Sequence, residues 1–142
     1  MTYYPDFSQY VYWSEFQQPN TFNIGWLDES QIYNKGKTSQ LFQQRLLEFC
    51  FVPMCVTRGW HLCPFCDANS PIELQKGGKS FKLGSAEIRV IGKNDRIFAS
   101  PNLIYHYVVD HNYCPPDEFV NAVLESPFPN APRYIERFKN LR

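Results

Sequence analysis

The sequence predicts a small α+β protein of one domain built around a metal site, and three observations lead to this prediction. A length of 142 residues suits a single domain. Short segments between glycine-containing turns predict antiparallel strands, and segments with apolar residues three and four apart predict helices. Two cysteines and two histidines have spacings typical of a structural zinc site. We therefore expect one zinc-stabilised domain over residues 1–142.

The composition favours a folded core and gives little support to nucleic-acid binding. Twelve Phe, nine Tyr and three Trp bring large areas that a core can bury. Fourteen Lys and Arg balance fourteen Asp and Glu, so the formal net charge is zero. Phosphate binding depends on clustered basic residues, and the one local basic cluster, at 133–142, is interpreted as a solvated helix face.

The sequence also predicts a cytosolic protein without a membrane span. Residues 1–10 lack a basic region followed by an apolar run, which a secretion signal would need. No segment approaches the roughly 18 apolar residues that cross a bilayer. In the cytosol, five cysteines are expected to be thiols or metal ligands rather than disulfides.

The first third of the chain predicts a wrapping segment followed by a helix. Residues 1–37 show little periodicity, so we expect extended segments and turns around the core, with a strand at 22–27. Residues 39–50 predict the first helix, which Ser39 caps and Pro53 follows. Its apolar stripe consists of Phe42, Leu46, Phe49 and Cys50.

Residues 58–112 are the expected core of the zinc site. Turns at 76–79 and 92–95 separate four short strand-like segments, which predicts antiparallel hairpins. These segments are 72–74, 80–83, 87–90 and 96–99. Ser100 and Pro101 then predict the start of a helix that ends near His111.

The remainder of the chain predicts two more helices. Pro115 to Asp117 marks the start of one helix, whose inward residues are expected at 119, 120, 123 and 124. Residues 126–142 form a proline-rich tail, with a short helix expected at 133–141.

The metal-ligand pattern is Cys63 and Cys66 in a CxxC, followed by His106 and His111. Two thiolates at this spacing can reach one ion at a Zn–S distance of about 2.3 Å, and H-x4-H falls within the range of structural Cys2His2 sites. Residues five apart point about 140° away from each other on an ideal helix. Both histidines can therefore face one ion only if His111 lies at the helix end, where Asn112 is a favourable terminator.

The order of these elements is that of a treble-clef zinc finger. A CxxC turn is followed by hairpin strands and then by a helix that carries two ligands. In this arrangement the ion ties the turn to the helix and stabilises the fold. A closed tetrahedral Cys2His2 shell favours zinc over iron.

Other interpretations of the same residues stay open. The CxxC could form a redox pair, or the cysteines and histidines could be incidental. His61 could replace a ligand or hydrogen-bond to one, whereas Cys114 is interpreted as a packed thiol. A closed shell of four protein ligands leaves no position for water, which disfavours an enzyme; an enzyme would need an open metal site, for instance if His61 and His111 compete for one position. Residues 72–98 also contain no histidine that could serve a treble-clef nuclease.

Four runs of sequence together resemble an uncharacterised bacterial protein family. They are NIGWLD at 23–28, RGWHLCPFC at 58–66, LGSAEIRV at 83–90 and ASPNLIYHYVVDHNYCPPDEF at 99–119. The resemblance extends to about Leu124 and leaves the tail from Ser126 outside. It implies a bacterial protein of one domain with important Cys and His positions, and it supplies no activity.

The first functional hypothesis is a protein-interaction module, for example an immunity protein that neutralises a bacterial toxin. Tyr and Trp favour interfaces, and the N-terminal segment is rich in aromatic residues. These are Tyr3, Tyr4, Tyr10, Tyr12, Trp13 and Phe16. Whether they form an interface or cap the core stays open at this point.

The alternative hypothesis is a nucleic-acid-binding zinc finger. Its basic residues would be Arg133, Arg137, Lys139 and Arg142, together with Lys76, Lys79 and Lys82. A DNA-reading finger presents a basic helix, but residues 101–112 contain no Lys or Arg and include Asp110. This composition disfavours base readout.

Overall fold

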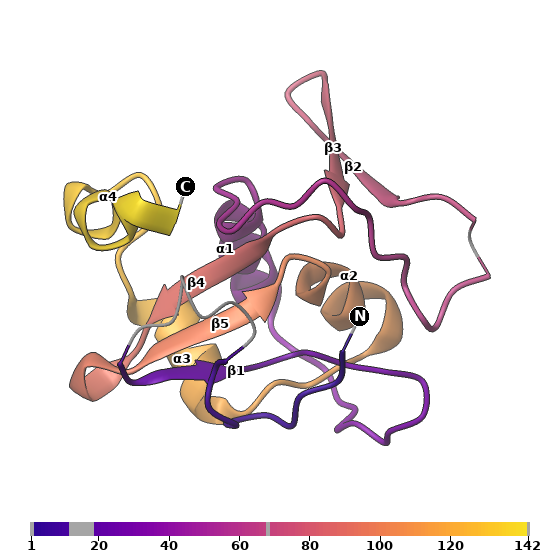
Figure 1. Ribbon diagram of the computed structural model, residues 1–142, viewed down its shortest axis with the longest axis horizontal. Helices are drawn as coiled ribbons and strands as arrows, with labels where there is room; N and C mark the ends of the chain where they lie inside the picture. The colour runs from indigo at the N-terminus through magenta and orange to yellow at the C-terminus, as the bar shows by residue number, and fades with distance from the viewer. Residues whose placement is uncertain (1, 12–18, 68, 142) are drawn as a thin grey trace.

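The computed structural model describes residues 2–11, 19–67 and 69–141 and has an α+β architecture with two small sheets (Figure 1). The larger sheet has the strand order β1–β5–β4. Strand β5 (Ile97–Pro101) pairs in parallel with β1 (Thr21–Asn23) and antiparallel with β4 (Glu87–Ile91). Helices α1 (Gln40–Cys50) and α3 (Asp117–Glu125) pack on β4 and on each other, which encloses the main core.

The second sheet is a hairpin that extends away from this core (Figure 1). Its strands are β2 (Ile72–Lys76) and β3 (Lys79–Leu83), which are antiparallel. The two residues between them, Gly77 and Gly78, have φ of 57° and 77°. Positive φ at both positions is what a two-residue hairpin turn requires, and glycine adopts it readily. The predicted hairpin is therefore confirmed.

The helices confirm most of the boundaries predicted from the sequence. Ser39 caps α1, because its Oγ accepts a hydrogen bond of 3.1 Å from the Phe42 amide. Helix α2 (Ile104–His111) ends at Asn112, which has a left-handed conformation. The tail forms α4 (Pro132–Phe138) and a final turn at Lys139–Leu141. Among the described residues, no helix combines the length and apolarity that crossing a membrane would require.

The predicted helix start at Ser100 and Pro101 is wrong, because both residues belong to β5. Strand β5 lies between β1 and β4, and Ser100 pairs with Ile88 while Pro101 pairs with Glu87. The Ser100 hydroxyl is buried and caps no helix, since α2 begins at Ile104. Ser100 and Pro101 have the local pattern of a helix start, but pairing with β4 determines their conformation.

The strand predicted at 22–27 is shorter in the structure. Pairing with β5 ends at Asn23; beyond it the Ile24 amide and the Trp26 indole Nε1 each donate to the Ala99 carbonyl at 3.0 Å. Gly25 follows with φ of 80°, and its amide donates to Asp6 Oδ1 at 2.9 Å. This left-handed residue turns the chain out of the sheet.

Strand β4 is buried on both faces, although its alternating polar and apolar residues are typical of a strand with one solvated face. Arg89 Nη1 lies 2.8 Å from Glu87 Oε1, and the Tyr10 hydroxyl donates to the same oxygen at 2.9 Å. The Arg89 guanidinium also lies over the Tyr10 ring at 4.6 Å. The two charges are tolerated inside the protein because they are paired and hydrogen-bonded.

This network also decides the role of part of the aromatic N-terminal segment. Tyr10 is fully buried and Tyr4 packs edge-on against Trp26 at 5.6 Å, so these two residues cap the core. Tyr3 is half-buried. Tyr12, Trp13 and Phe16 lie outside the described residues.

The treble-clef arrangement stays a prediction. The CxxC turn, a hairpin and a helix do follow one another along the chain. However, two hairpins separate the turn from α2, and they belong to different sheets, with β2–β3 in one and β4–β5 in the other.

Candidate metal centre

The CxxC motif forms a compact turn that brings its two sulfurs to the same side. The Cys66 amide donates to the Cys63 carbonyl at 3.4 Å, which closes the turn. The Phe65 amide donates to the Cys63 sulfur at 3.4 Å. An N–H donor directed at sulfur stabilises negative charge on it, which suits a thiolate ligand.

Helix α2 supplies the two histidines from different parts of its length. His106 lies within the helix and is buried, whereas His111 is its last residue. The left-handed conformation of Asn112 ends the helix immediately after His111. In addition, the Tyr33 hydroxyl donates to the His111 carbonyl at 2.9 Å and holds the helix end in place. The five-residue spacing is thus accommodated at a helix terminus, as expected from the sequence.

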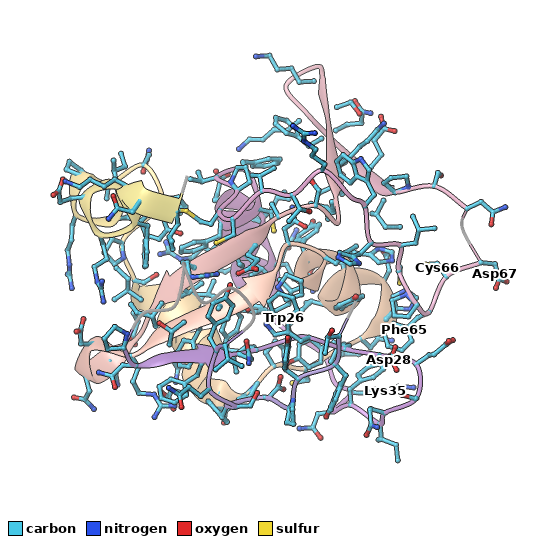
Figure 2. The ribbon with its side chains drawn as sticks, viewed as in Figure 1. Trp26, Asp28, Lys35, Phe65, Cys66 and Asp67 are labelled. Atoms are coloured by element: carbon cyan, nitrogen blue, oxygen red, sulfur yellow. The ribbon has the colours of Figure 1, made fainter. Side chains whose placement is uncertain are left out.

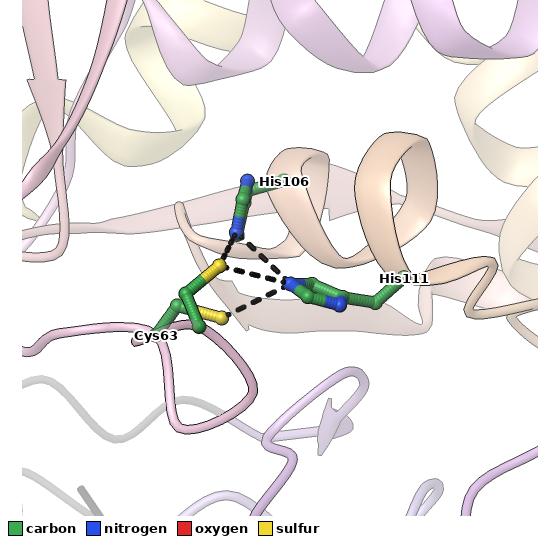
Figure 3. A group of neighbouring side chains, drawn as sticks. Cys63, His106 and His111 are labelled. Atoms are coloured by element: carbon green, nitrogen blue, oxygen red, sulfur yellow. Dashed lines mark hydrogen bonds between the residues drawn. The ribbon is translucent and has the colours of Figure 1, made fainter. Parts of the chain in front are cut away.

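The structure brings Cys63, Cys66, His106 and His111 together, with one ligand atom of each residue within 4.8 Å of the others. Figure 3 shows the two imidazoles and Cys63 directed at one point. His111 Nε2 lies 3.3 Å from each sulfur and 3.2 Å from His106 Nε2. His106 Nε2 lies 3.2 Å from the Cys66 sulfur. The group can therefore hold one metal ion.

These separations fit a single tetrahedral zinc ion. With Zn–S near 2.3 Å and Zn–N near 2.0 Å, a tetrahedron places its ligand atoms roughly 3.3 to 3.8 Å apart. The observed nitrogen–sulfur and nitrogen–nitrogen distances of 3.2 to 3.3 Å lie at or just below the lower end of this range. Four such donors complete a tetrahedral shell, which is typical of a structural site rather than a catalytic one.

Asp110 lies beside one of the two imidazoles. Its Oδ2 lies 2.7 Å from Nδ1 of His106, one helical turn away, although the N–H direction is not aligned for a linear hydrogen bond. A carboxylate beside Nδ1 favours the proton on that nitrogen and leaves the Nε2 lone pair for a metal. From the sequence, Asp110 was considered only as a charge that disfavours base readout, although its i,i+4 spacing from His106 on a helix was a signal for this contact.

Phe65, inside the CxxC, anchors the turn to the rest of the protein. Its ring lies 5.2 Å from that of Tyr33, 5.7 Å from Tyr107 and 5.3 Å from His111. Figure 2 shows Phe65 and Cys66 on the outer loop, at the end of the molecule that also holds Lys35. From the sequence, Phe65 was assigned no role, and its contacts with helix α2 were missed.

The protein environment shifts the pKa of two of the four ligand groups toward the neutral form. Burial, as the largest cause, raises the pKa of the Cys63 thiol to about 11. Burial also lowers the pKa of His111, and the neighbouring His106 lowers it further. A bound cation would favour loss of the Cys63 proton, and the neutral imidazole of His111 can ligate without losing one.

The two spare candidate ligands lie outside this group of four. His61 lines a separate cavity together with Trp26 and Glu87. The His61 amide donates to the Gly84 carbonyl at 2.9 Å, and a Cβ on Gly84 would lie 2.3 Å from the His61 carbonyl oxygen. Cys114 packs near Gly36, and its amide donates to the Asn34 carbonyl, as expected of a packed thiol.

The comparison with known proteins places the chain in a family. A family model described as "Domain of unknown function (DUF7919)" matches residues 2–124, and the chain therefore belongs to this family. The match includes all four candidate ligands and ends where the sequence resemblance was expected to end. No curated protein and no solved structure matches the chain.

Proposed function

We propose that this member of the DUF7919 family is a zinc-stabilised protein-interaction module. The observation that carries the proposal is the convergence of Cys63, Cys66, His106 and His111 on one point. A zinc ion held there by two sulfurs and two Nε2 atoms would join the CxxC turn to helix α2. Zinc would act as a structural cross-link, and no reaction is assigned to it.

The surface next to this cross-link supports protein binding. Trp60 and Leu62 directly precede Cys63, and their side chains are 46% and 41% exposed. Val56, on the same segment, is 61% exposed. Large apolar and aromatic side chains that stay exposed on an ordered segment are common in protein interfaces. Zinc would fix this segment and so reduce the entropy that it loses on binding a partner.

The specific role that we propose is that of an immunity protein, which neutralises a bacterial toxin by binding it. The support is indirect: a small domain with zero formal net charge, a closed ligand shell and an exposed aromatic segment beside it. A catalytic zinc site would keep an open position, whereas this shell has four protein donors. Binding, rather than turnover, is the activity that such a site serves best.

The metal is tested by elemental analysis of the purified protein and of two ligand variants. We expect one zinc per chain in the wild type and loss of zinc in Cys63→Ser and His106→Ala. The matched controls are Cys114→Ser and His61→Asn, which change the same residue types outside the group of four and should keep one zinc. A wild-type protein that folds without any metal would contradict the structural-zinc proposal.

The interaction is tested with the double variant Trp60→Ala and Leu62→Ala. Because both side chains are exposed, the variant should keep its zinc and its unfolding midpoint. A toxin that the wild type neutralises in co-expression should stay active with the variant. An equal loss of protection in the control Ile135→Ala, an exposed apolar residue on α4, would argue against this surface. Salt-dependent binding of the wild type to DNA would favour the nucleic-acid alternative instead.

A further inference from the structure

A second candidate site lies at the end of the molecule away from the metal centre. It is a cavity of about 370 Å³ between the turn after β4, helix α3 and the start of α4. In Figure 1 these elements lie opposite the CxxC loop and helix α2. A cavity of this size is within the range of small-molecule sites. Its lining residues include Ile91, Lys93, Asn121, Glu125, Ser126 and Arg133.

Ser126 is one of the residues that line this cavity, and its side chain has a hydrogen-bonding group without a partner among the described residues. The residue is 9% exposed, and its Oγ is buried without a hydrogen-bond partner among the described residues. The Ser126 backbone, in contrast, is fully engaged: its amide donates to Ala122 and its carbonyl accepts from Arg45. A buried hydroxyl without a partner is unfavourable, which a ligand that completes its hydrogen bond would correct.

Two cations also line the cavity without an ion-pair partner. Among the described residues, neither Lys93 nor Arg133 makes an ion pair. Of the two carboxylates in the lining, Glu118 is neutralised by Arg96, whose Nε lies 2.7 Å from its Oε2. Glu125 is the remaining negative group, and it is exposed. With the Arg96 pair counted as neutral, the cavity has one positive charge in excess.

From these features we infer that the cavity binds a small organic molecule that carries an oxyanion, either a carboxylate or a phosphate. The guanidinium of Arg133 and the ammonium of Lys93 supply charged donors for the oxyanion, and the Ser126 hydroxyl supplies a neutral one. The apolar side chains of Ile91 and Ala122 line the same space and suit the carbon part of such a ligand. This site does not depend on the proposed function of the metal centre.

The test uses the full chain, with succinate and inorganic phosphate as the two probes. Binding is followed by titration calorimetry and by the rise in the unfolding midpoint, which a ligand specific for the folded state produces. We expect saturable binding of succinate, and binding of phosphate as well if the oxyanion alone is sufficient. Arg133→Gln should weaken succinate binding by about tenfold or more, because it removes a charged donor. Lys139→Gln, at an exposed cation outside the cavity, should leave binding unchanged.

Two further variants should change succinate affinity in opposite directions. Ser126→Ala should weaken succinate binding without lowering the unfolding midpoint of the free protein, since it removes a hydroxyl that has no partner there. Glu125→Gln should tighten binding, because it removes the carboxylate that repels an anion. The zinc content of every variant should equal that of the wild type. The inference would be overturned if neither probe binds saturably up to about 20 mM. It would also be overturned if Arg133→Gln and Ser126→Ala both bind succinate as tightly as the wild type does.

Discussion

Two buried polar clusters in this protein contain cysteine, and they meet the cost of burying polar groups in different ways. The arginine cluster, defined as Tyr10, Cys55, Glu87 and Arg89, contains its own cation. Arg89 pairs with Glu87 at 2.8 Å, and its Nη2 lies 3.6 Å from the Cys55 sulfur. The metal centre has four donor atoms within 4.8 Å and no cation among them.

The difference indicates which cluster requires an external ion. In the arginine cluster the guanidinium pairs with the carboxylate within the chain, although Arg89 Nε has no hydrogen-bond partner among the described residues. In the metal centre the sulfurs and Nε2 atoms face one another, the Phe65 amide donates to the Cys63 sulfur, and burial raises the pKa of the Cys63 thiol to about 11. Two cysteine sulfurs and two imidazole nitrogens that converge on one point are the donor set that zinc prefers in structural sites.

Removal of zinc is expected to have the largest effect. Chelation should destabilise the protein by several kcal/mol, because structural zinc sites contribute roughly 10 kcal/mol or more in small peptides. The measurement is urea unfolding with and without chelator, followed by return of zinc. Recovery of the original midpoint on adding zinc would show that the loss is specific to the metal. An unchanged midpoint in metal-free protein would mean that the metal centre, like the arginine cluster, needs no external ion for stability.

Loss of the internal cation should have the next largest effect. Arg89→Met leaves Glu87 buried without its partner, and breaking a buried pair in this way costs about 3–5 kcal/mol. Urea unfolding measures the loss, and zinc content should stay at one per chain. The double variant Arg89→Met with Glu87→Gln should recover part of the stability, because it removes the unpaired charge. If the double variant is less stable than the single one, the pairing argument fails.

Truncation of the anchor in the CxxC turn should have an intermediate effect. Phe65→Ala removes the ring contacts with Tyr33, Tyr107 and His111 and should cost about 2 kcal/mol, since the ring is half-buried. We expect zinc to be retained but released faster to a chelator. Phe128→Ala, at an exposed ring elsewhere, is the matched control. Equal zinc release rates in the two variants would show that Phe65 does not hold the turn.

The smallest expected effect concerns the orientation of one ligand. Asp110→Asn should lower zinc affinity by about tenfold, which is the scale for groups that orient a metal-bound histidine. Stability in excess zinc should change little, because the Asp110 side chain is 58% exposed. Competition with a zinc-binding dye gives the affinity. An affinity equal to that of the wild type would mean that helix α2 alone orients His106.

The sequence was sufficient where a signal is local. The apolar spacing and Ser39 cap predicted α1, the glycine pair predicted the β2–β3 turn, and Asn112 predicted the end of α2. Each of these depends on a few neighbouring residues and on backbone preferences that the rest of the fold supports. The four candidate ligands were also chosen from spacing and residue type, and the structure brings these same four residues together.

Tertiary structure decided the features that depend on distant neighbours. Ser100 and Pro101 have the local pattern of a helix start, but two flanking strands keep them in β5. Glu87 and Arg89 have the pattern of an exposed strand face, but Tyr10, 77 residues from Glu87, covers them and hydrogen-bonds with the carboxylate. Sequence spacing determines what a segment can do by itself. The face of a segment that becomes buried depends on which other segments pack against it. Only the folded chain shows which segments these are.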